Sequence, residues 1–357
     1  MKSLQAILLA TVIVPLAASE AAAGSVVLTG PDNLDGAYTP SQIAAEATGA
    51  NTVNFGGLTG ITLWSFLGGS DTTTSTTNSS GTTKNYGQIV TFNPTGANSN
   101  PNFDLRYYVV GSGGNGAQTA VSLGQIDPGF VGTASPVPFV AFQTTGGSLL
   151  PTPQLVIPNG PAGSTIQNLT SLQLGFVPAL PQGPGGQSKG VTITGNVGSP
   201  NTTYTQFPGG FTPTTLNVLN SSNQITDTYT GIPLATLLNV PASVGLNGQI
   251  VVASATDGYQ VVYSLDELLN ADGSANPNAL LAYAATGTDF PGDGIARTIT
   301  GQDGPFKHGR WVSNVLELDV ESAATPVPAA LPLFVTGLGA LGLFGWRRKA
   351  RRSVKAA

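Results

Sequence analysis

The sequence predicts an α+β fold that is predominantly β and is built from two tandem modules. Turn-forming residues are abundant, with 47 Gly and 26 Pro among 357 residues, and only 9% of the residues are charged. Short β-branched and apolar runs, bounded by Gly, Pro and Asn, are typical of strands. Several short segments also recur in the same order in both parts of the body, which predicts a repeated architecture.

The first 23 residues read as an export signal. Lys2 gives the start a positive charge, an apolar run extends from Ala6 to Ala18, and the small residues Ala21, Ala22 and Ala23 follow. A basic start, a short apolar stretch and a small-residue exit are the features of a secretory signal peptide. We therefore expect residues 1–23 to be removed from an exported protein.

The body is expected to divide into a first module at 24–177 and a second at 188–321, joined by a Pro/Gly linker at 178–187. The matched segments are Thr59–Leu67 with Thr230–Leu238, Val109–Gly116 with Val251–Gly258, Ser122–Ile126 with Ser264–Leu268, and Ile166–Leu169 with Val312–Val315. The first module is longer because it contains the Thr/Ser/Asn-rich stretch 69–102, which has too few apolar residues to pack and is expected to be an exposed loop.

Hydrophobic patterning places strands and two short helices in these modules. Strands are expected at Ser25–Thr29, Leu105–Val110, Gln154–Ile157, Ser171–Phe176, Val191–Thr194, Gln249–Ala253, Gln260–Tyr263, Ala296–Thr300 and Val312–Val320. Helices are expected at Pro233–Asn239 and at Leu265–Asn270, the latter with Ser264 as its N-cap. In the last strand, Leu316, Leu318 and Val320 alternate with acidic residues, which predicts one buried face.

The C-terminal segment 322–357 contains a second apolar stretch. Residues 329–346 carry no charge, and a helix of that length would cover about 27 Å, close to the hydrocarbon thickness of a bilayer. The stretch 347–355 that follows is basic, as is typical of the cytoplasmic flank of a membrane helix. We expect a transmembrane helix at 329–346 that ends at the interfacial Trp346.

The order of features in this tail resembles a known signal. Pro326, Val327 and Pro328 precede the Gly/Leu-rich span, and the basic cluster Arg347, Arg348 and Lys349 follows it. This order resembles a PEP-CTERM sorting signal of exported proteins in Gram-negative bacteria, although Val327 replaces the motif's Glu. The resemblance implies that the export machinery, signal peptidase and an exosortase-like enzyme are partners. It also implies an intermediate anchored in the inner membrane and then release to the cell surface or extracellular matrix.

A second resemblance concerns the body of the chain. Its residues are Thr230–Leu234, Asp257–Tyr259, Leu280–Tyr283 and Gly309–Val315. Together they resemble the molybdopterin-binding domain of the sulfite oxidase family, and the first module matches the same plan more loosely. In that family a cysteine thiolate binds molybdenum, and this chain has no cysteine. We therefore expect degenerate modules with no catalytic residue, no metal site and no cofactor. The alternative is a molybdopterin-dependent oxidoreductase-like enzyme, or an anion- or cofactor-binding protein, without the thiolate.

Composition narrows the possible partners. Without the two end segments, 6 basic and 17 acidic residues remain, so the body lacks the basic surface that nucleic-acid binding requires. The absence of Cys and the single histidine exclude Cys-ligated and multi-His metal sites. Low charge and Thr/Ser/Asn-rich loops instead suit hydrogen bonding to an extracellular polysaccharide.

The candidate ligand-binding residues lie together in one short segment. Lys307, His308, Arg310 and Trp311 combine two cations, the only imidazole and an aromatic ring. They predict either an anion pocket or an exposed turn whose Trp311 packs into the core. The glycine-rich stretch 111–116 has the spacing of a dinucleotide-binding loop, but a strand rather than a helix is expected to follow it, so we interpret it as a hairpin turn.

Overall fold

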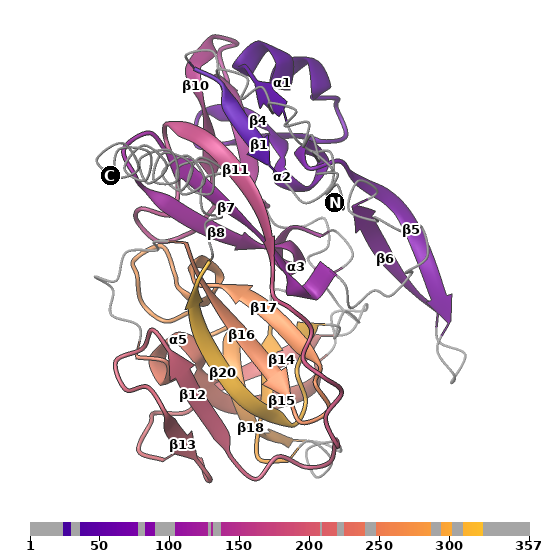
Figure 1. Cartoon of the computed structure of the whole chain (residues 1–357), viewed down its shortest axis with the longest axis vertical. Helices are drawn as coiled ribbons and strands as arrows, with labels where there is room; N and C mark the ends of the chain where they lie inside the picture. The colour runs from indigo at the N-terminus through magenta and orange to yellow at the C-terminus, as the bar shows by residue number, and fades with distance from the viewer. Residues whose placement is uncertain are drawn as a thin grey trace, which may run out of the picture.

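The fold is described from a computed structural model, which defines residues 24–29, 36–77, 83–89, 104–127, 130, 137–207, 209–219, 225–239, 248–286, 294–301 and 310–323. Within these residues, the strands form four sheets of four or five strands and one two-stranded ribbon. We refer to residues 24–177 as the first half and to 188–323 as the second half. The two halves lie end to end along the long axis of the molecule (Figure 1).

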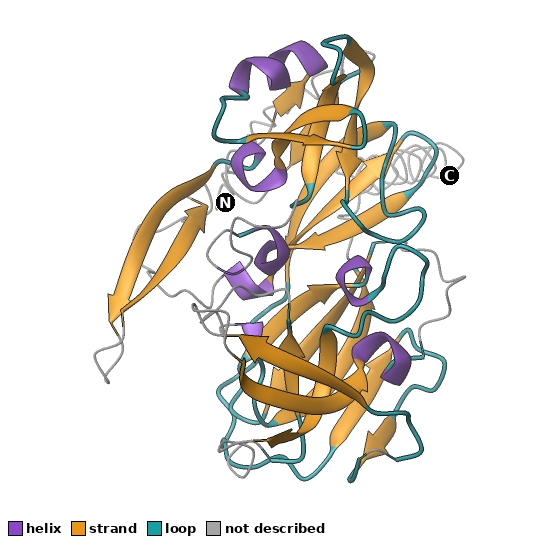
Figure 2. Ribbon diagram, turned by 180° about the vertical axis from the view of Figure 1, so that it is seen from behind, coloured by secondary structure: helices purple, strands orange, loops and turns teal. Residues whose placement is uncertain are grey.

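The elements of the first half begin with strand β1 and end with β11. They are β1 (Val26–Thr29), β2 (Gly36–Tyr38), α1 (Pro40–Glu46), β3 (Thr52–Phe55), β4 (Leu58–Thr62), α2 (Leu63–Phe66), β5 (Gly69–Thr77), β6 (Thr83–Ile89), η2 (Asp104–Arg106), β7 (Tyr107–Gly113), β8 (Gln118–Ser122), α3 (Leu123–Ile126), β9 (Phe139–Thr144), β10 (Leu149–Val156) and β11 (Leu169–Phe176). β5 and β6 pair only with each other and form a separate ribbon (Figure 2).

The second half contains the same kinds of element in a similar order. They are β12 (Val191–Gly195), β13 (Thr202–Tyr204), β14 (Thr214–Leu219), β15 (Ile225–Pro233), α5 (Leu234–Leu237), β16 (Gln249–Ala255), β17 (Gln260–Ser264), η3 (Asp266–Leu268), β18 (Ala279–Thr286), β19 (Arg297–Thr300) and β20 (Val315–Ser322).

The two halves share one sheet topology. The order β2-β1-β11-β7-β8 in the first half corresponds to β13-β12-β20-β16-β17 in the second, and β10-β9-β4-β3 corresponds to β19-β18-β15-β14. In both halves the first strand lies parallel to the last, β1 with β11 and β12 with β20. The segments that match in sequence occupy corresponding positions in these sheets, which allows residues of the two halves to be compared one by one.

A glycine bulge illustrates how closely the halves correspond. The register shifts at Gly60 in β4 and at Gly231 in β15. A Cβ atom at Gly60 would lie 2.4 Å from the Val140 carbonyl oxygen, and one at Gly231 would lie 2.6 Å from the Leu281 carbonyl oxygen. Both positions therefore require glycine because a neighbouring strand passes too close for any side chain.

The predicted fold class was wrong. The structure is mainly β, and it shows no sulfite-oxidase-like modules. The helical segments are short: α1 has seven residues, α2, α3 and α5 have four residues each, and η3 is a 3-10 turn of three residues. Among the described residues, none forms a helix long and apolar enough to cross a membrane. The predicted transmembrane stretch 329–346, like the rest of the tail from residue 324 onward and the signal peptide, lies outside these residues.

The predicted burial pattern of the last strand was also partly wrong. Leu318 and Val320 are buried, but Leu316 is 48% exposed. A bulge explains the difference, since Ser254 on β16 pairs with Glu317 whereas Ala255 pairs with Val315. The extra residue at the bulge shifts the alternation, so Val315 rather than Leu316 faces the core. The glycine-rich stretch 111–116, in contrast, closes the β7–β8 hairpin as expected.

Candidate functional site

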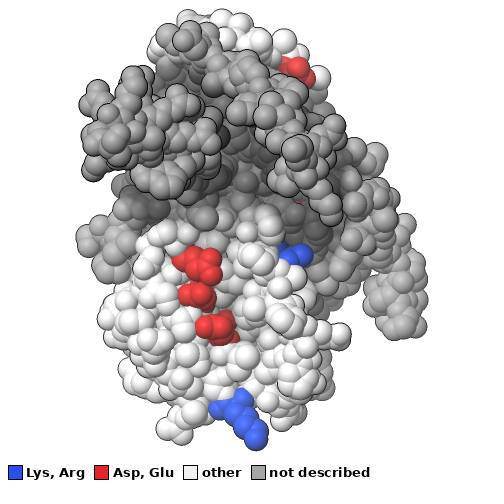
Figure 3. All heavy atoms as spheres, viewed as in Figure 1, with Lys and Arg blue, Asp and Glu red and all other residues white. Residues whose placement is uncertain are grey.

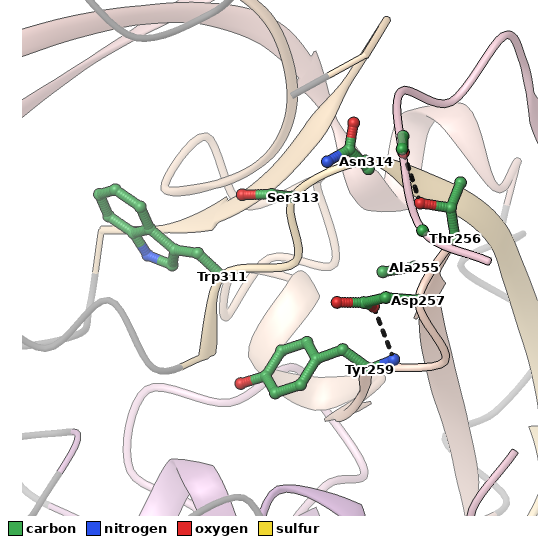
Figure 4. A pocket seen from close by; sticks show the side chains of 9 residues that line it. Ala255, Thr256, Asp257, Tyr259, Trp311, Ser313 and Asn314 are labelled. Atoms are coloured by element: carbon green, nitrogen blue, oxygen red, sulfur yellow. Dashed lines mark hydrogen bonds between the residues drawn. The ribbon is translucent and has the colours of Figure 1, made fainter. Parts of the chain in front are cut away.

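A polar pocket opens at the end of the β16–β17 hairpin in the second half. Its volume is about 280 Å³, and its lining comprises Gly185, Gly186, Ala255, Thr256, Asp257, Tyr259, Trp311, Ser313 and Asn314. The hairpin turn supplies one side, and the segment that leads into β20 supplies the other. In Figure 4 the Asp257 carboxylate, the Ser313 hydroxyl and the Tyr259 ring extend toward the same side of the turn.

The stretch predicted as a linker forms a wall of this pocket. The Gly183 N–H donates to the Asp257 carbonyl at 3.0 Å, and the Gly185 N–H donates to the Thr256 carbonyl at 3.2 Å. The Thr256 hydroxyl in turn donates to the Gly186 carbonyl at 2.6 Å. These bonds hold residues 183–186 against the second half, so this segment is part of the pocket rather than a free connection.

The hairpin turn fixes the acidic side chain of the pocket. Oδ1 of Asp257 accepts a hydrogen bond from the Tyr259 N–H at 2.9 Å, which is the local bond of an Asx turn. Asp257 is exposed. The Tyr259 ring is half-buried and packs against the core of the second half. The pocket thus combines a solvated carboxylate with an aromatic ring that is held in place.

The opposite side of the pocket is formed by Trp311, Ser313 and Asn314, which supply an indole, a hydroxyl and an amide group. Asn314 adopts a left-handed conformation with φ 52, and its carbonyl accepts from the Thr256 N–H at 3.2 Å. Its side-chain oxygen is buried without a hydrogen-bond partner among the described residues. Ser313 Oγ accepts from Arg297 Nε at 3.1 Å, and Trp311 Nε1 donates to the Thr300 carbonyl at 3.4 Å.

The predicted ligand-binding cluster is only partly in this site. Trp311 lines the pocket and is largely buried, at 8% exposure. Arg310, its neighbour in sequence, turns the other way: its side chain is 1% exposed and forms an ion pair with Glu267. Lys307 and His308 lie outside the described residues. Among the described residues, the positive charge of Arg310 is therefore used inside the protein rather than at the pocket.

The first half has the same turn without the same side chains. Asn115 accepts from the Ala117 N–H at 3.1 Å, as Asp257 does from Tyr259. The Gly114 N–H donates to the Asn168 carbonyl at 3.0 Å, as Thr256 does to Asn314. At the positions of Asp257, Tyr259, Trp311 and Ser313, however, the first half has Asn115, Ala117, Thr165 and Gln167. The fold itself therefore requires neither the carboxylate nor the two aromatic rings.

Acidic side chains also lie along β20, the strand that begins just after Asn314. Figure 3 shows them in a row over β20, where Glu317, Asp319 and Glu321 occupy alternate positions. Partial burial, followed by repulsion from Asp319 and Glu317, raises the pKa of Glu321. Within the described parts of the chain, no group of three His, Cys, Asp or Glu side chains is placed to hold a metal ion. This face of the second half therefore disfavours anionic ligands.

Comparison with known proteins does not assign the chain to a family. No protein-family model matches the chain, and no curated protein matches it. The pocket was missed in the sequence because the linker wall and the hairpin turn are far apart in the chain. A usable signal was nevertheless present beside the repeat: Tyr259 and Trp311 lie just outside the matched segments, where the first half has Ala117 and Thr165.

Proposed function

We propose that this chain is an exported, non-catalytic protein of the cell surface or extracellular matrix, and that its second half binds an uncharged saccharide unit in the pocket at Asp257. The single observation that carries this proposal is the contrast between the two halves. The carboxylate and the aromatic rings are present at one of two otherwise equivalent turns, so we assign them a role in ligand binding in addition to the packing of the two rings.

The chemistry of the pocket suits a sugar. A pyranose presents an apolar C–H face that packs on an aromatic ring, and Tyr259 offers such a ring. Sugar hydroxyls both donate and accept hydrogen bonds, which matches the Asp257 carboxylate and the amide of Asn314. The volume of about 280 Å³ corresponds to the small end of ligand pockets and suits one ring of a longer chain. The Asp257 carboxylate in the lining favours a neutral saccharide over an anionic one.

The two ends of the chain support the proposed location. The segment 1–23 has the features of a signal peptide, and the order of Pro326–Pro328, the apolar span and the basic residues resembles a PEP-CTERM signal. An exosortase-like enzyme would then act on the membrane-anchored intermediate and release the body to the surface.

Calorimetric titration of the purified chain with neutral gluco-, galacto- and manno-oligosaccharides tests this function. We expect one of these classes to bind, and Tyr259→Ala to weaken binding about tenfold or more because it removes the ring that the sugar packs against. Asp257→Asn should weaken binding by a similar factor while the turn is kept, since Asn115 makes the same turn in the first half.

The matched control is Asn115→Asp, which adds a carboxylate to the corresponding exposed turn of the first half. It should leave binding unchanged. If none of the neutral oligosaccharides binds, or if Tyr259→Ala and Asp257→Asn bind as tightly as the unsubstituted protein, the pocket is not a saccharide site.

A further inference from the structure

A buried apolar cluster composed of equivalent residues lies between the two halves, and Leu105 and Phe130 of the first half also pack into the core of the second half. From the first half the cluster contains Tyr108, Val110, Ala120 and Val177, and from the second half Ile250, Val252, Val262 and Ala323. In the matched topologies these are four corresponding pairs: two on β7 and β16, one on β8 and β17, and one just after β11 and β20. A contact in which both partners use the same patch is an isologous, two-fold contact.

The polar contacts at this junction follow the same symmetry. The Ser122 hydroxyl of the first half donates to Oε1 of Glu267 at 2.9 Å. The Ser264 hydroxyl of the second half donates to Oε1 of Gln125 at 2.7 Å. Ser122 corresponds to Ser264, and Gln125 corresponds to Glu267. The hydrogen bond from the first half to the second therefore has an equivalent from the second half to the first.

Charge breaks this symmetry in one place. The second half contributes Asp266, Glu267 and Arg310, where the first half has Gly124, Gln125 and Ser164. Arg310 pairs with Glu267 and passes against Gly124, since a Cβ atom there would lie 2.6 Å from Arg310 Nε. Its NH2 group also lies 3.5 Å from the Ser122 hydroxyl. The charged groups of the second half thus fit the surface of the first half, which has Gly124 and Gln125. They do not fit a second copy of the second-half surface.

We propose that the junction has the two-fold symmetry of a homodimer interface, although both of its surfaces belong to one chain. In this proposal Asp266, Glu267 and Arg310 make the interface specific for a first half paired with a second half. Two second halves in the same arrangement would bury two Asp266–Glu267 pairs against each other, and like charges placed together at an interface strongly disfavour association. Two first halves would leave empty the space that Arg310 fills beside Gly124, and such a cavity is also unfavourable. The partner that fits either surface is therefore the other half, from the same chain or from a second copy.

The test uses the full chain with a protease site inserted after Ala179, which is exposed and precedes the segment that lines the pocket. After folding, the chain is cut and its mass is followed by light scattering on a sizing column. We expect the cut halves to stay together as a one-to-one complex. Separation of the halves, or sorting into pairs of identical halves, would overturn the proposal.

A charge substitution makes the test specific. Gln125→Glu places a carboxylate opposite Asp266, whose Oδ2 now lies 3.4 Å from the Gln125 amide nitrogen. At pH 8 we expect it to weaken the association of the cut halves about tenfold or more. Gln173→Glu is the matched control, because it adds the same charge to the first half on β11, where β20 has Asp319. An equal effect of the two substitutions would contradict the proposed role of the junction.

Discussion

Replacing Arg310 by methionine is expected to lower the free energy of unfolding by about 3–5 kcal/mol. The side chains of Arg310 and Glu267 are 1% and 2% exposed, so the substitution leaves a carboxylate buried without its cation. Arg310 also lies over the Tyr263 ring, with 5.3 Å from its guanidinium carbon to the ring centroid, and this contact is lost as well. Urea denaturation followed by circular dichroism measures the change.

Two further variants separate charge from packing. Arg297→Met removes a half-buried arginine elsewhere in the second half and should have a much smaller effect. The double variant Arg310→Met with Glu267→Gln should recover part of the lost stability, since no buried charge then remains. If the double variant is no more stable than Arg310→Met alone, the unpaired charge is not the cause of the loss.

Asp266→Asn is expected to stabilise the protein at neutral pH and to have little effect near pH 4. Burial is the main cause that raises the pKa of Asp266 to about 7, the charge of Glu267 adds to it, and hydrogen bonds from Ser264 and Gln125 oppose it. Because the folded-state pKa lies above the unfolded value of 3.8, the folded protein holds this proton more tightly. The contribution of Asp266 to stability is therefore complete below pH 4 and is lost as the pH rises toward 7.

The measurement compares the unfolding free energies of the two proteins across this pH range. The difference in favour of Asp266→Asn should grow by up to about 4 kcal/mol between pH 4 and pH 8. Asp272→Asn is a control of opposite sign: Asp272 is exposed, and hydrogen bonds from Ser274 lower its pKa. A pH-independent difference for Asp266→Asn would show that Asp266 does not titrate within the junction.

Some of this architecture could be predicted from the sequence, because local patterns report local structure. Strands β1, β11, β12 and β17 lie within a few residues of their expected bounds. Other strands, such as β9 and β15, were missed because β9 begins with a continuous apolar run and β15 has Thr rather than apolar residues at alternate positions. The position of Leu316 could not be foreseen, since the bulge in β20 depends on the register against β16.

The functional residues were less predictable than the strands. Trp311 was named as a candidate from its polar neighbours, and it does line the pocket. Arg310 was grouped with it because the two are adjacent in sequence, but the Arg310 side chain is buried against Glu267 whereas Trp311 lines the pocket. The contact of Arg310 with Glu267 and Ser122 joins residues far apart in the chain, and no local pattern indicates it.

The most direct test of the proposed function is a crystal structure of the protein grown with the neutral oligosaccharide that binds it best. We expect one sugar ring in the pocket, packed on Tyr259, with its hydroxyls bonded to the Asp257 carboxylate and the Asn314 amide. The corresponding turn of the first half, at Asn115 and Ala117, should hold no sugar. A sugar bound on the first half or on the β5–β6 ribbon, with the pocket at Asp257 left empty, would contradict the account.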